Sequence, residues 1–271
     1  MKNLLALPVI VLIVIACNDN NSTVKTTETK DSLQTLLISY RDSINKYPSD
    51  TLLKYEFVQT MQDAGMFKEA VSFLDSMNRG VDSANLKTYF AYLYKRAELL
   101  TESGDTAKAI KTFELFVIPG ELTEAGKQLA NLYAETKNPR TIAICDSMIK
   151  NDASGRDPEP NFFKGAYYYN IDDYDKALQQ FNTCINKEYT FLDAYMEKGR
   201  ILYKQAKYKE AIEVYDLAIK VSNSFADAHF WKGKCQEALG QKEEAKISYQ
   251  RAYAFDKTFT EAKEAAERIK N

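Results

Sequence analysis

Residues 192–225 read LDAYMEKGRILYKQAKYKEAIEVYDLAIKVSNSF, and residues 226–259 read ADAHFWKGKCQEALGQKEEAKISYQRAYAFDKTF. The two stretches carry similar residue types at the same places, and a third copy precedes them in residues 158–191. Four columns recur at an interval of 34 residues: Gly165, Gly199 and Gly233; Ala177, Ala211 and Ala245; Phe181, Tyr215 and Tyr249; Cys184, Ala218 and Ala252. A fixed interval of this length indicates a repeat protein built from one supersecondary unit.

The repeating columns have physical reasons that suit a pair of packed helices. A small residue at the eighth position of each unit lets a second helix lie close against the first, and small residues at positions 20 and 27 serve the same contact. The aromatic residue at position 24 fills the space between adjoining units. Gly240 falls in the turn between the helices, where a positive φ costs glycine little. Ala206 and Asp172 take the same place in the two preceding units.

In its period and its columns the chain resembles the tetratricopeptide-repeat family, whose units are two antiparallel helices. The resemblance implies an all-α fold, a right-handed α-solenoid of about six helical hairpins with a capping helix at each end. The columns place the units at about 51–84, 90–123, 124–157, 158–191, 192–225 and 226–259. The third unit fits least well, because Asn131 stands at its eighth position and Ser147 at its aromatic position, although Ala143 keeps a small column. Gly65 and Gly104 mark the turns of the first two units.

The ends of the expected solenoid, residues 32–271, have the composition of caps. Residues 33–47 read as a lone second helix that Pro48 closes. Residues 260–271 begin TEAKEAAERIK, an amphipathic segment whose Ala262, Ala265, Ala266 and Ile269 would cover the last unit. Stacks of this kind need terminal units with a polar outer face. The sequence therefore predicts fourteen helices and no strand.

Residues 1–17 have the features of an export signal. Lys2 gives a positive start, and residues 4–15 form an apolar run of twelve. Such a run is too short for a membrane span, which needs about 20 residues. The ending VIAC at 14–17 resembles the bacterial lipobox, which implies that Cys17 becomes the lipidated first residue. The alternative is an ordinary signal peptide cleaved nearby, with Cys17 incidental.

Residues 18–31 are expected to be a disordered polar tether. The segment NDNNSTVKTTETK at 18–30 is too polar to bury a core, and thirteen coil residues reach roughly 20 Å. Asn18 rather than Asp follows the cysteine, which by analogy with known sorting favours the outer membrane. The resemblance implies a protein of the bacterial cell envelope, held to a lipid bilayer through Cys17.

The sequence offers few groups for catalysis, metal binding or nucleic-acid binding. The one histidine, His229, lies six residues from Cys235, so on a helix the two side chains are roughly 120° apart and form no dyad. Cys145 and Cys184 complete the cysteines after Cys17, and Cys184 falls in a small core column. There is no C-x-x-C pair or phosphate-binding loop, and the net charge of −2 comes without a basic block. We predict a protein that is not an enzyme and takes no cofactor, metal or nucleic acid.

The family resemblance implies a concave surface, lined by the first helix of each unit, where partners bind. Its groove-facing columns are positions 2, 5, 9, 12 and 13. Carried onto the well-registered units, they give as partner-binding candidates Phe162, Tyr169, Met196, Arg200, Tyr203, Lys204, Phe230 and Lys234. Aromatic residues, methionine and arginine are favoured in protein-binding hot spots.

Two functions fit these features. The first is a non-enzymatic scaffold or adaptor at the membrane that binds a protein or peptide in the concave groove. The second is a lipoprotein that captures a small ligand, such as a glycan or a cell-wall peptide, by stacking it on the tyrosine and phenylalanine rings.

Overall fold

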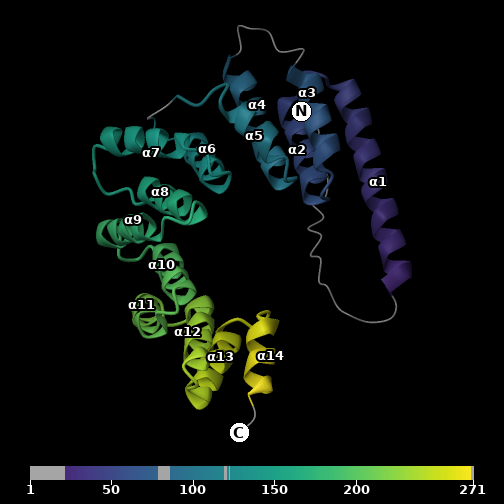
Figure 1. Ribbon diagram of the computed structural model, residues 1–271. Helices are drawn as coiled ribbons and strands as arrows, with labels where there is room; N and C mark the ends of the chain where they lie inside the picture. The colour runs from purple at the N-terminus through teal and green to yellow at the C-terminus, as the bar shows by residue number, and fades with distance from the viewer. Residues whose placement is uncertain (1–21, 79–85, 119–120, 122, 270–271) are drawn as a thin grey trace. The chain divides into compact units, whose positions relative to one another are not determined.

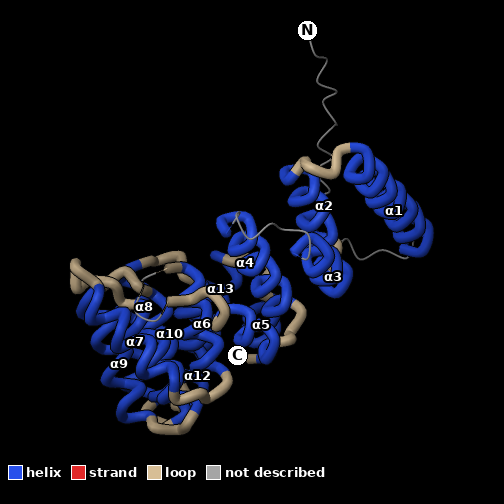
Figure 2. The backbone as a smooth tube through the Cα atoms, turned by 90° about the horizontal axis from the view of Figure 1, so that it is seen from above, coloured by secondary structure: helices blue, strands red, loops and turns tan. Residues whose placement is uncertain are grey.

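The computed structural model describes residues 22–78, 86–118, 121 and 123–269. Within these ranges it contains fourteen helices and no strand (Figures 1 and 2). The predicted helix count and the all-α solenoid class are confirmed. The chain divides into two compact parts, residues 1–77 and 78–271, which we call the N-terminal part and the C-terminal part.

The N-terminal part contains α1 (Ser22–Lys46), α2 (Thr51–Asp63) and most of α3 (Phe67–Asn78). Aromatic rings join the three helices. The ring centroid of Phe57 on α2 lies 5.8 Å from that of Tyr40 on α1 and 4.9 Å from that of Phe73 on α3. Helices α2 and α3 form the first hairpin, and α1 is the lone helix expected before it.

Helix α1 begins earlier than the sequence predicts. Residues 22–31, expected as a disordered tether, form its first turns instead. Once residues 33–46 are helical, the helix can extend toward the N-terminus one residue at a time without the free-energy cost of nucleating a new helix. Lysine and glutamate, which occur in this stretch, also have high helix propensity. The export signal, Cys17 and residues 18–21 lie outside the described residues.

The C-terminal part holds the other five hairpins and the final cap. Its helices are α4 (Leu86–Glu102), α5 (Thr106–Phe113), α6 (Glu124–Glu135), α7 (Arg140–Asn151), α8 (Glu159–Asn170), α9 (Tyr174–Lys187), α10 (Leu192–Lys204), α11 (Tyr208–Val221), α12 (Ala226–Ala238), α13 (Lys242–Phe255) and α14 (Thr260–Arg268). The even-numbered helices from α4 to α12 are the first helices of their units, and the odd-numbered helices from α5 to α13 are the second helices.

Each hairpin turns on one residue of left-handed backbone. Positive φ angles between 57° and 79° occur at Gly65, Gly104, Lys137, Asp172, Ala206 and Gly240. Five of these six are the predicted turn residues. The sixth, Lys137, fixes the register of the third unit, which the sequence left uncertain.

The third unit has a different register from the expected one. Gly165 lies seven residues before the turn at Asp172, and the residue seven before Lys137 is Ala130, which is fully buried. Ala130 therefore fills the small eighth column, and the assignment of Asn131 to that column is wrong by one residue.

The second helix of the third unit is displaced further. Its fully buried side chains are Thr141, Cys145 and Met148. They take the places of Ala177, Phe181 and Cys184 one unit later, so the expected core roles of Ala143, which is exposed, and Ser147 are wrong by two residues. Counted from the turn residue, α7 reaches its first core side chain one residue sooner than α9 does. Pro139 stands in this shortened connection, directly before α7.

The eighth column and the aromatic column meet inside each hairpin. A Cβ atom added to Gly165, Gly199 or Gly233 would come within 2.6, 2.4 or 2.8 Å of the ring of Phe181, Tyr215 or Tyr249. The small residue therefore lets the ring of the second helix lie on the backbone of the first. The predicted close approach of the two helices is confirmed, but the aromatic residue, expected to fill the space between adjoining units, also packs inside its own hairpin. In the other units the same two positions hold Val58 and Leu74, Ala97 and Phe113, and Ala130 and Cys145. Where the eighth residue is larger than glycine, the residue that it meets on the second helix is no larger than the phenylalanine or tyrosine of the glycine units.

Helix α14 caps the last unit. Ala262, Ala266 and Ile269 are buried against it, while the charged side chains of the helix are exposed. Arg268 donates to both carboxylate oxygens of Glu237 on α12, at 2.8 and 2.9 Å. The predicted C-terminal cap is confirmed.

Candidate functional site

The first helices of the C-terminal part form a continuous surface. Helix α6 packs on α8, α8 on α10 and α10 on α12, and the side chain of Gln128 on α6 donates to the Tyr94 hydroxyl on α4 at 3.0 Å. Side chains at positions 2, 5, 9, 12 and 13 of these helices therefore share one side of the stack. We call this side the inner face.

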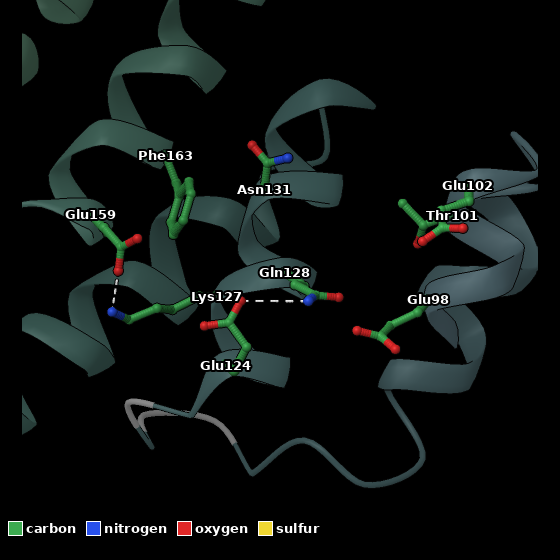
Figure 3. Close-up of a pocket in the computed structure, with 9 residues that line it drawn as sticks. All are labelled: Glu98, Thr101, Glu102, Glu124, Lys127, Gln128, Asn131, Glu159 and Phe163. Atoms are coloured by element: carbon green, nitrogen blue, oxygen red, sulfur yellow. Dashed lines mark hydrogen bonds and ion pairs between the residues drawn. The ribbon is translucent and has the colours of Figure 1, made fainter. Parts of the chain in front are cut away.

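The inner face is hollowed across the second, third and fourth units. A cavity of about 360 Å³ opens between α4, α6 and α8 (Figure 3). Its lining is Glu98, Thr101, Glu102, Glu124, Lys127, Gln128, Asn131, Glu159 and Phe163. Most of these residues occupy the groove-facing columns once the third unit takes its corrected register. Four carboxylates and one ammonium group give the hollow an acidic character.

Ion pairs and burial set the charges around the hollow. Lys127 Nζ lies 3.0 Å from Asp157 Oδ2 and also pairs with Glu159. Burial alone would lower the pKa of Lys127, but these carboxylates raise it above its ordinary value. Burial, followed by the charges of Glu98 and Glu124, raises the pKa of Tyr94 to about 12. Lys127 is therefore charged and Tyr94 neutral at physiological pH.

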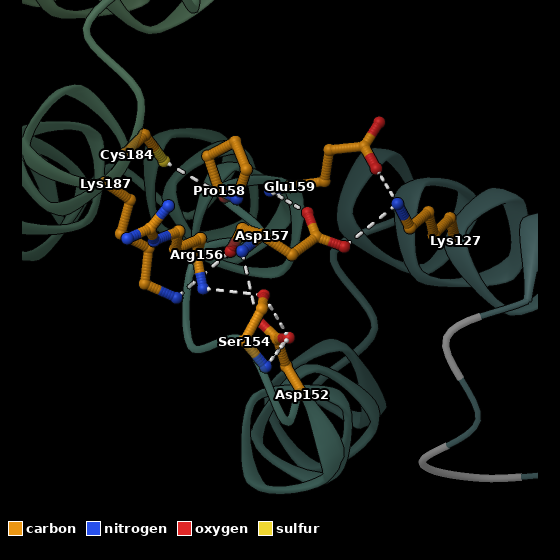
Figure 4. A network of polar contacts seen from close by, with 9 residues as sticks. All are labelled: Lys127, Asp152, Ser154, Arg156, Asp157, Pro158, Glu159, Cys184 and Lys187. Carbon is orange, nitrogen blue, oxygen red and sulfur yellow. Dashed lines mark hydrogen bonds and ion pairs between the residues drawn. The ribbon is translucent and has the colours of Figure 1, made fainter.

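The connection between α7 and α8 holds one wall of the hollow in place (Figure 4). Asp152 accepts from Ser154 Oγ at 2.6 Å and from the backbone N of Asp157 at 2.9 Å. Hydrogen bonds from these two residues hold the pKa of Asp152 at about 2. The backbone oxygen of Asp157 accepts from Lys187 Nζ at 3.0 Å. The Asp157 carboxylate that pairs with Lys127 therefore lies in a loop whose backbone is held by hydrogen bonds to Asp152 and Lys187.

Two of the predicted partner-binding residues belong to the core. Met196 and Phe230 are each only 4% exposed. Phe162 is half-buried, with its ring centroid 5.3 Å from that of Phe191 and 5.6 Å from that of Phe181. The expectation that Met196 and Phe230 contact a partner is wrong, because their side chains are covered by other residues of this chain.

A sequence signal explains this burial. Phe191, Phe225 and Phe259 recur at 34-residue spacing as the last residue of each unit. Phe259 covers Phe230, with 4.7 Å between ring centroids, and Phe225 packs in the same cluster as Met196. A fifth-position residue in a unit that ends in phenylalanine is therefore buried, as Met196 and Phe230 are, or half-buried, as Phe162 is.

The other predicted residues form a half-exposed set on the inner face of α8, α10 and α12. Lys204 Nζ lies 5.2 Å from the ring centroid of Tyr169 in the preceding unit. Arg200 Cζ and Lys234 Nζ lie 5.3 and 4.9 Å from the ring centroid of Trp231. Three residues outside the prediction contact this set: Trp231 of α12, Tyr174 of α9 and Tyr208 of α11. We call the whole group the aromatic–cation array, and its members are Tyr169, Tyr174, Arg200, Tyr203, Lys204, Tyr208, Trp231 and Lys234.

Trp231 is a member that the sequence interpretation missed. Its ring centroid lies 5.5 Å from that of Tyr203, at the centre of the array. It stands at the sixth position of its unit, and Phe163 at the sixth position of the fourth unit lines the hollow. The family columns omit this position, but the large aromatic residues that occupy it in two units could have indicated it.

The histidine and the three described cysteines are packing residues. His229 is 4% exposed, its Nε2 lies 2.9 Å from the backbone oxygen of Asn223, and its ring stacks on Phe255. Burial raises the pKa of each buried thiol, Cys145, Cys184 and Cys235, to about 12. These thiols are therefore protonated and poor nucleophiles at physiological pH.

Two further features are absent from the part of the chain that the structure describes. No three His, Cys, Asp or Glu side chains there are grouped so as to hold a metal ion. No helix there combines the length and the apolar character that crossing a bilayer requires.

Known proteins share the repeat and the fold. Residues 199–240 match a family profile described as TPR repeat, and residues 226–259 and 91–117 match two profiles described as tetratricopeptide repeat. No curated protein sequence matches the chain significantly. A crystal structure of a tetratricopeptide repeat protein from Parabacteroides merdae is similar with a TM-score of 0.63 and 20% identity, over 91% of this chain and 96% of that one. A crystal structure of MamA protein has a TM-score of 0.48 and 20% identity, over 63% of this chain and 93% of that one. The three profile matches, together with the hairpins and columns described above, identify the chain as a tetratricopeptide-repeat protein, and the Parabacteroides merdae structure has a similar fold.

Proposed function

We propose that this chain is a non-enzymatic scaffold of the bacterial cell envelope that holds a polypeptide segment on its inner face. The observation that carries the proposal is that the hollow at α4, α6 and α8 (Figure 3) and the aromatic–cation array at α8, α10 and α12 lie along first helices that pack on one another. Stacked helical repeats use such extended surfaces for binding.

The dimensions of the inner face suit a peptide. First helices packed at about 9–10 Å spacing give a path of roughly 40 Å across five helices. An extended chain covers that distance in about twelve residues, at about 3.4 Å each. Acidic and amide side chains line one end of the path, and aromatic rings line the other. A polypeptide with a basic residue at one end and apolar residues at the other is complementary to both.

A small ligand such as a glycan or a cell-wall peptide is the second candidate. The half-exposed rings of Tyr169, Tyr203 and Trp231 favour it, since aromatic faces stack on sugars. Against it, Lys204, Arg200 and Lys234 already lie within about 5 Å of those ring centroids. A long ligand that also reaches the hollow uses more of the surface, so the polypeptide is preferred.

Partner capture tests the binding face. We expect the tagged, membrane-anchored chain, cross-linked in its native cells, to capture a protein that a Tyr169→Ala/Tyr203→Ala/Lys204→Ala variant loses. A matched control is Tyr189→Ala/Leu217→Ala/Lys220→Ala, which changes exposed side chains away from the inner face. Both variants should retain the helical circular dichroism of the wild type. Equal capture by all three proteins would place binding elsewhere, and a thermal shift with glycans alone would favour the second candidate.

Membrane attachment is proposed to depend on Cys17. The apolar run at 4–15 and the ending VIAC support a lipid anchor, and the polar residues 18–21 separate Cys17 from α1. We expect the wild-type chain in the membrane fraction at its processed size. Cys17→Ser should be found either in the soluble fraction or at the size of the unprocessed chain. Cys235→Ser, a substitution at a buried thiol, should leave the distribution unchanged. Equal membrane retention of Cys17→Ser and the wild type, with both chains processed to the same size, would argue against lipidation.

A further inference from the structure

The hydroxyl of Tyr215 is a buried donor in an unusual position. Tyr215 lies on α11 and is fully buried. Its ring passes directly over Gly199 of α10, where an added Cβ would be 2.4 Å from Cζ and 2.8 Å from Oη. Among the described residues no hydrogen-bond acceptor reaches the hydroxyl.

The hydroxyl ends beside the inner face. Burial raises the pKa of Tyr215, and Arg200 and Glu197 on α10 are among the charged groups near enough to act on it. The phenol is therefore protonated and can donate. Arg200 stands at groove-facing position 9, and its Nε is also buried and unpaired among the described residues, although its Nη1 bonds to Glu197 at 2.7 Å.

The next unit shows how the same arrangement is completed inside the chain. Tyr249, the residue 34 positions after Tyr215, donates from its hydroxyl to Glu237 Oε2 at 2.8 Å. Arg268 donates to the same carboxylate. In this unit the ring of Tyr249 lies over Gly233, and its hydroxyl donates to the Glu237 carboxylate. Arg268 of the following helix binds the same carboxylate.

One unit earlier two of these three parts are present. Counting back 34 residues, Tyr215 replaces Tyr249 and Lys234 replaces Arg268, so the hydroxyl and the cation remain. Tyr203 stands where Glu237 supplies the carboxylate. The site therefore has a hydroxyl donor, the Nε donor of Arg200 and the two positive side chains of Arg200 and Lys234, of which Lys234 also lies 3.9 Å from a carboxylate oxygen of Glu261. It lacks the carboxylate that the tyrosine hydroxyl and the cation of the following helix bind in the next unit. Buried donors without acceptors are rare in native proteins because they are costly.

We propose that an aspartate or glutamate side chain of the bound polypeptide supplies the missing carboxylate, which accepts from Tyr215 Oη and Arg200 Nε beside Lys234. The inference rests on the proposed function, since it places one acidic residue in a polypeptide on the inner face. The Arg200 side chain is 40% exposed and is held by one ion pair with its neighbour Glu197, so it can turn to admit the carboxylate. The acidic residue lies next to aromatic or apolar residues of the partner, because Tyr203 and Trp231 flank the site.

The test uses defined peptides and matched tyrosine variants. A display library of random twelve-residue peptides is selected on the full chain in detergent, and the selected peptides are synthesised. We expect them to share one Asp or Glu, and exchange of that residue for Asn or Gln to weaken binding roughly tenfold, a change typical of one charge-assisted hydrogen bond. With Tyr215→Phe the preference for the acidic peptide should fall several-fold, because the carboxylate then keeps only Arg200 and Lys234. Phe181 at the same column shows that phenylalanine is accommodated there.

Tyr249→Phe is the control, because it removes the same atom one unit later. It should lower Tm, since Glu237 loses a donor, and leave the preference for the acidic peptide intact. Tyr215→Phe should leave Tm unchanged or raise it. An equal fall of Tm in both variants, or an acidic preference that Tyr215→Phe leaves unchanged, would show that the hydroxyl serves only a buried water and would overturn the inference. Peptides that bind without any shared acidic residue would overturn it while leaving the proposed function intact, and a failure to select peptides would contradict both.

Discussion

Replacement of Phe230 by alanine is expected to destabilise the C-terminal units by about 3–5 kcal/mol, the usual cost of removing a buried phenylalanine ring. The side chain is 4% exposed, and its ring centroid lies 4.7 Å from that of Phe259 and 5.5 Å from that of Tyr249. It therefore joins α12, α13 and the segment that leads into α14. The loss should appear as early unfolding of the last unit, because repeat proteins are stabilised by contacts between neighbours.

Urea unfolding followed by circular dichroism measures this change, with Lys234→Ala as the control. Lys234 stands one turn further along α12, is half-exposed and lies over the rings of Phe230 and Trp231. Its removal should cost only about 0.5–1 kcal/mol, the range of an exposed cation–π contact. If Phe230→Ala is as stable as Lys234→Ala yet fails to capture a partner, Phe230 contacts the partner and its assignment to the core is mistaken.

The hairpins could be predicted from the sequence because their columns have strict steric causes. A ring can lie on the backbone of the first helix only where the eighth residue is small, so Gly199 and Tyr215 must change together. The same columns located the turns at Ala206 and Gly240, and the structure confirms the positive φ at both. Element type and number followed from these few positions.

The register of the third unit could not be predicted in the same way. Ala130 and Cys145 meet the same steric need as Gly199 and Tyr215, but with neither a glycine nor a ring to mark the columns. The connection after Lys137 is also one residue shorter, so a fixed interval of 34 leads to the wrong residues. Volume compensation between two positions is visible only when both helices are in place.

The candidate site was only partly predictable. The position of a residue in the repeat determines which side of the helix its side chain is on, but it does not determine whether other residues cover that side chain. Arg200 and Met196 both occupy groove-facing columns, yet the side chain of Arg200 is 40% exposed and Met196 only 4%. The difference comes from the last residue of the unit, Phe225, which packs in the cluster that buries Met196. The hollow was missed for a related reason, since its middle helix belongs to the unit whose register was wrong.

Exchange of Gly199 for valine is expected to cost about 3 kcal/mol, at the upper end of the range for overpacking a core. Even the first added carbon would lie 2.4 Å from two ring atoms of Tyr215, a fully buried residue that has no room to withdraw. Valine has a better intrinsic helix propensity than glycine by a few tenths of a kcal/mol, so the clash decides the sign.

A double-mutant cycle with Tyr215→Leu tests whether the ring is the cause. Val58 and Leu74 hold these two positions in the first unit, so the double variant reproduces a pair that the chain already uses. Tyr215→Leu alone should cost about 2–3 kcal/mol through the cavity it leaves. In the double variant the added methyl groups enter that space, and the two costs should fall short of their sum by about 1–3 kcal/mol. Additive costs in urea unfolding would mean that Gly199 is required by the backbone of α10 itself, and the steric coupling of the two columns would have to be abandoned.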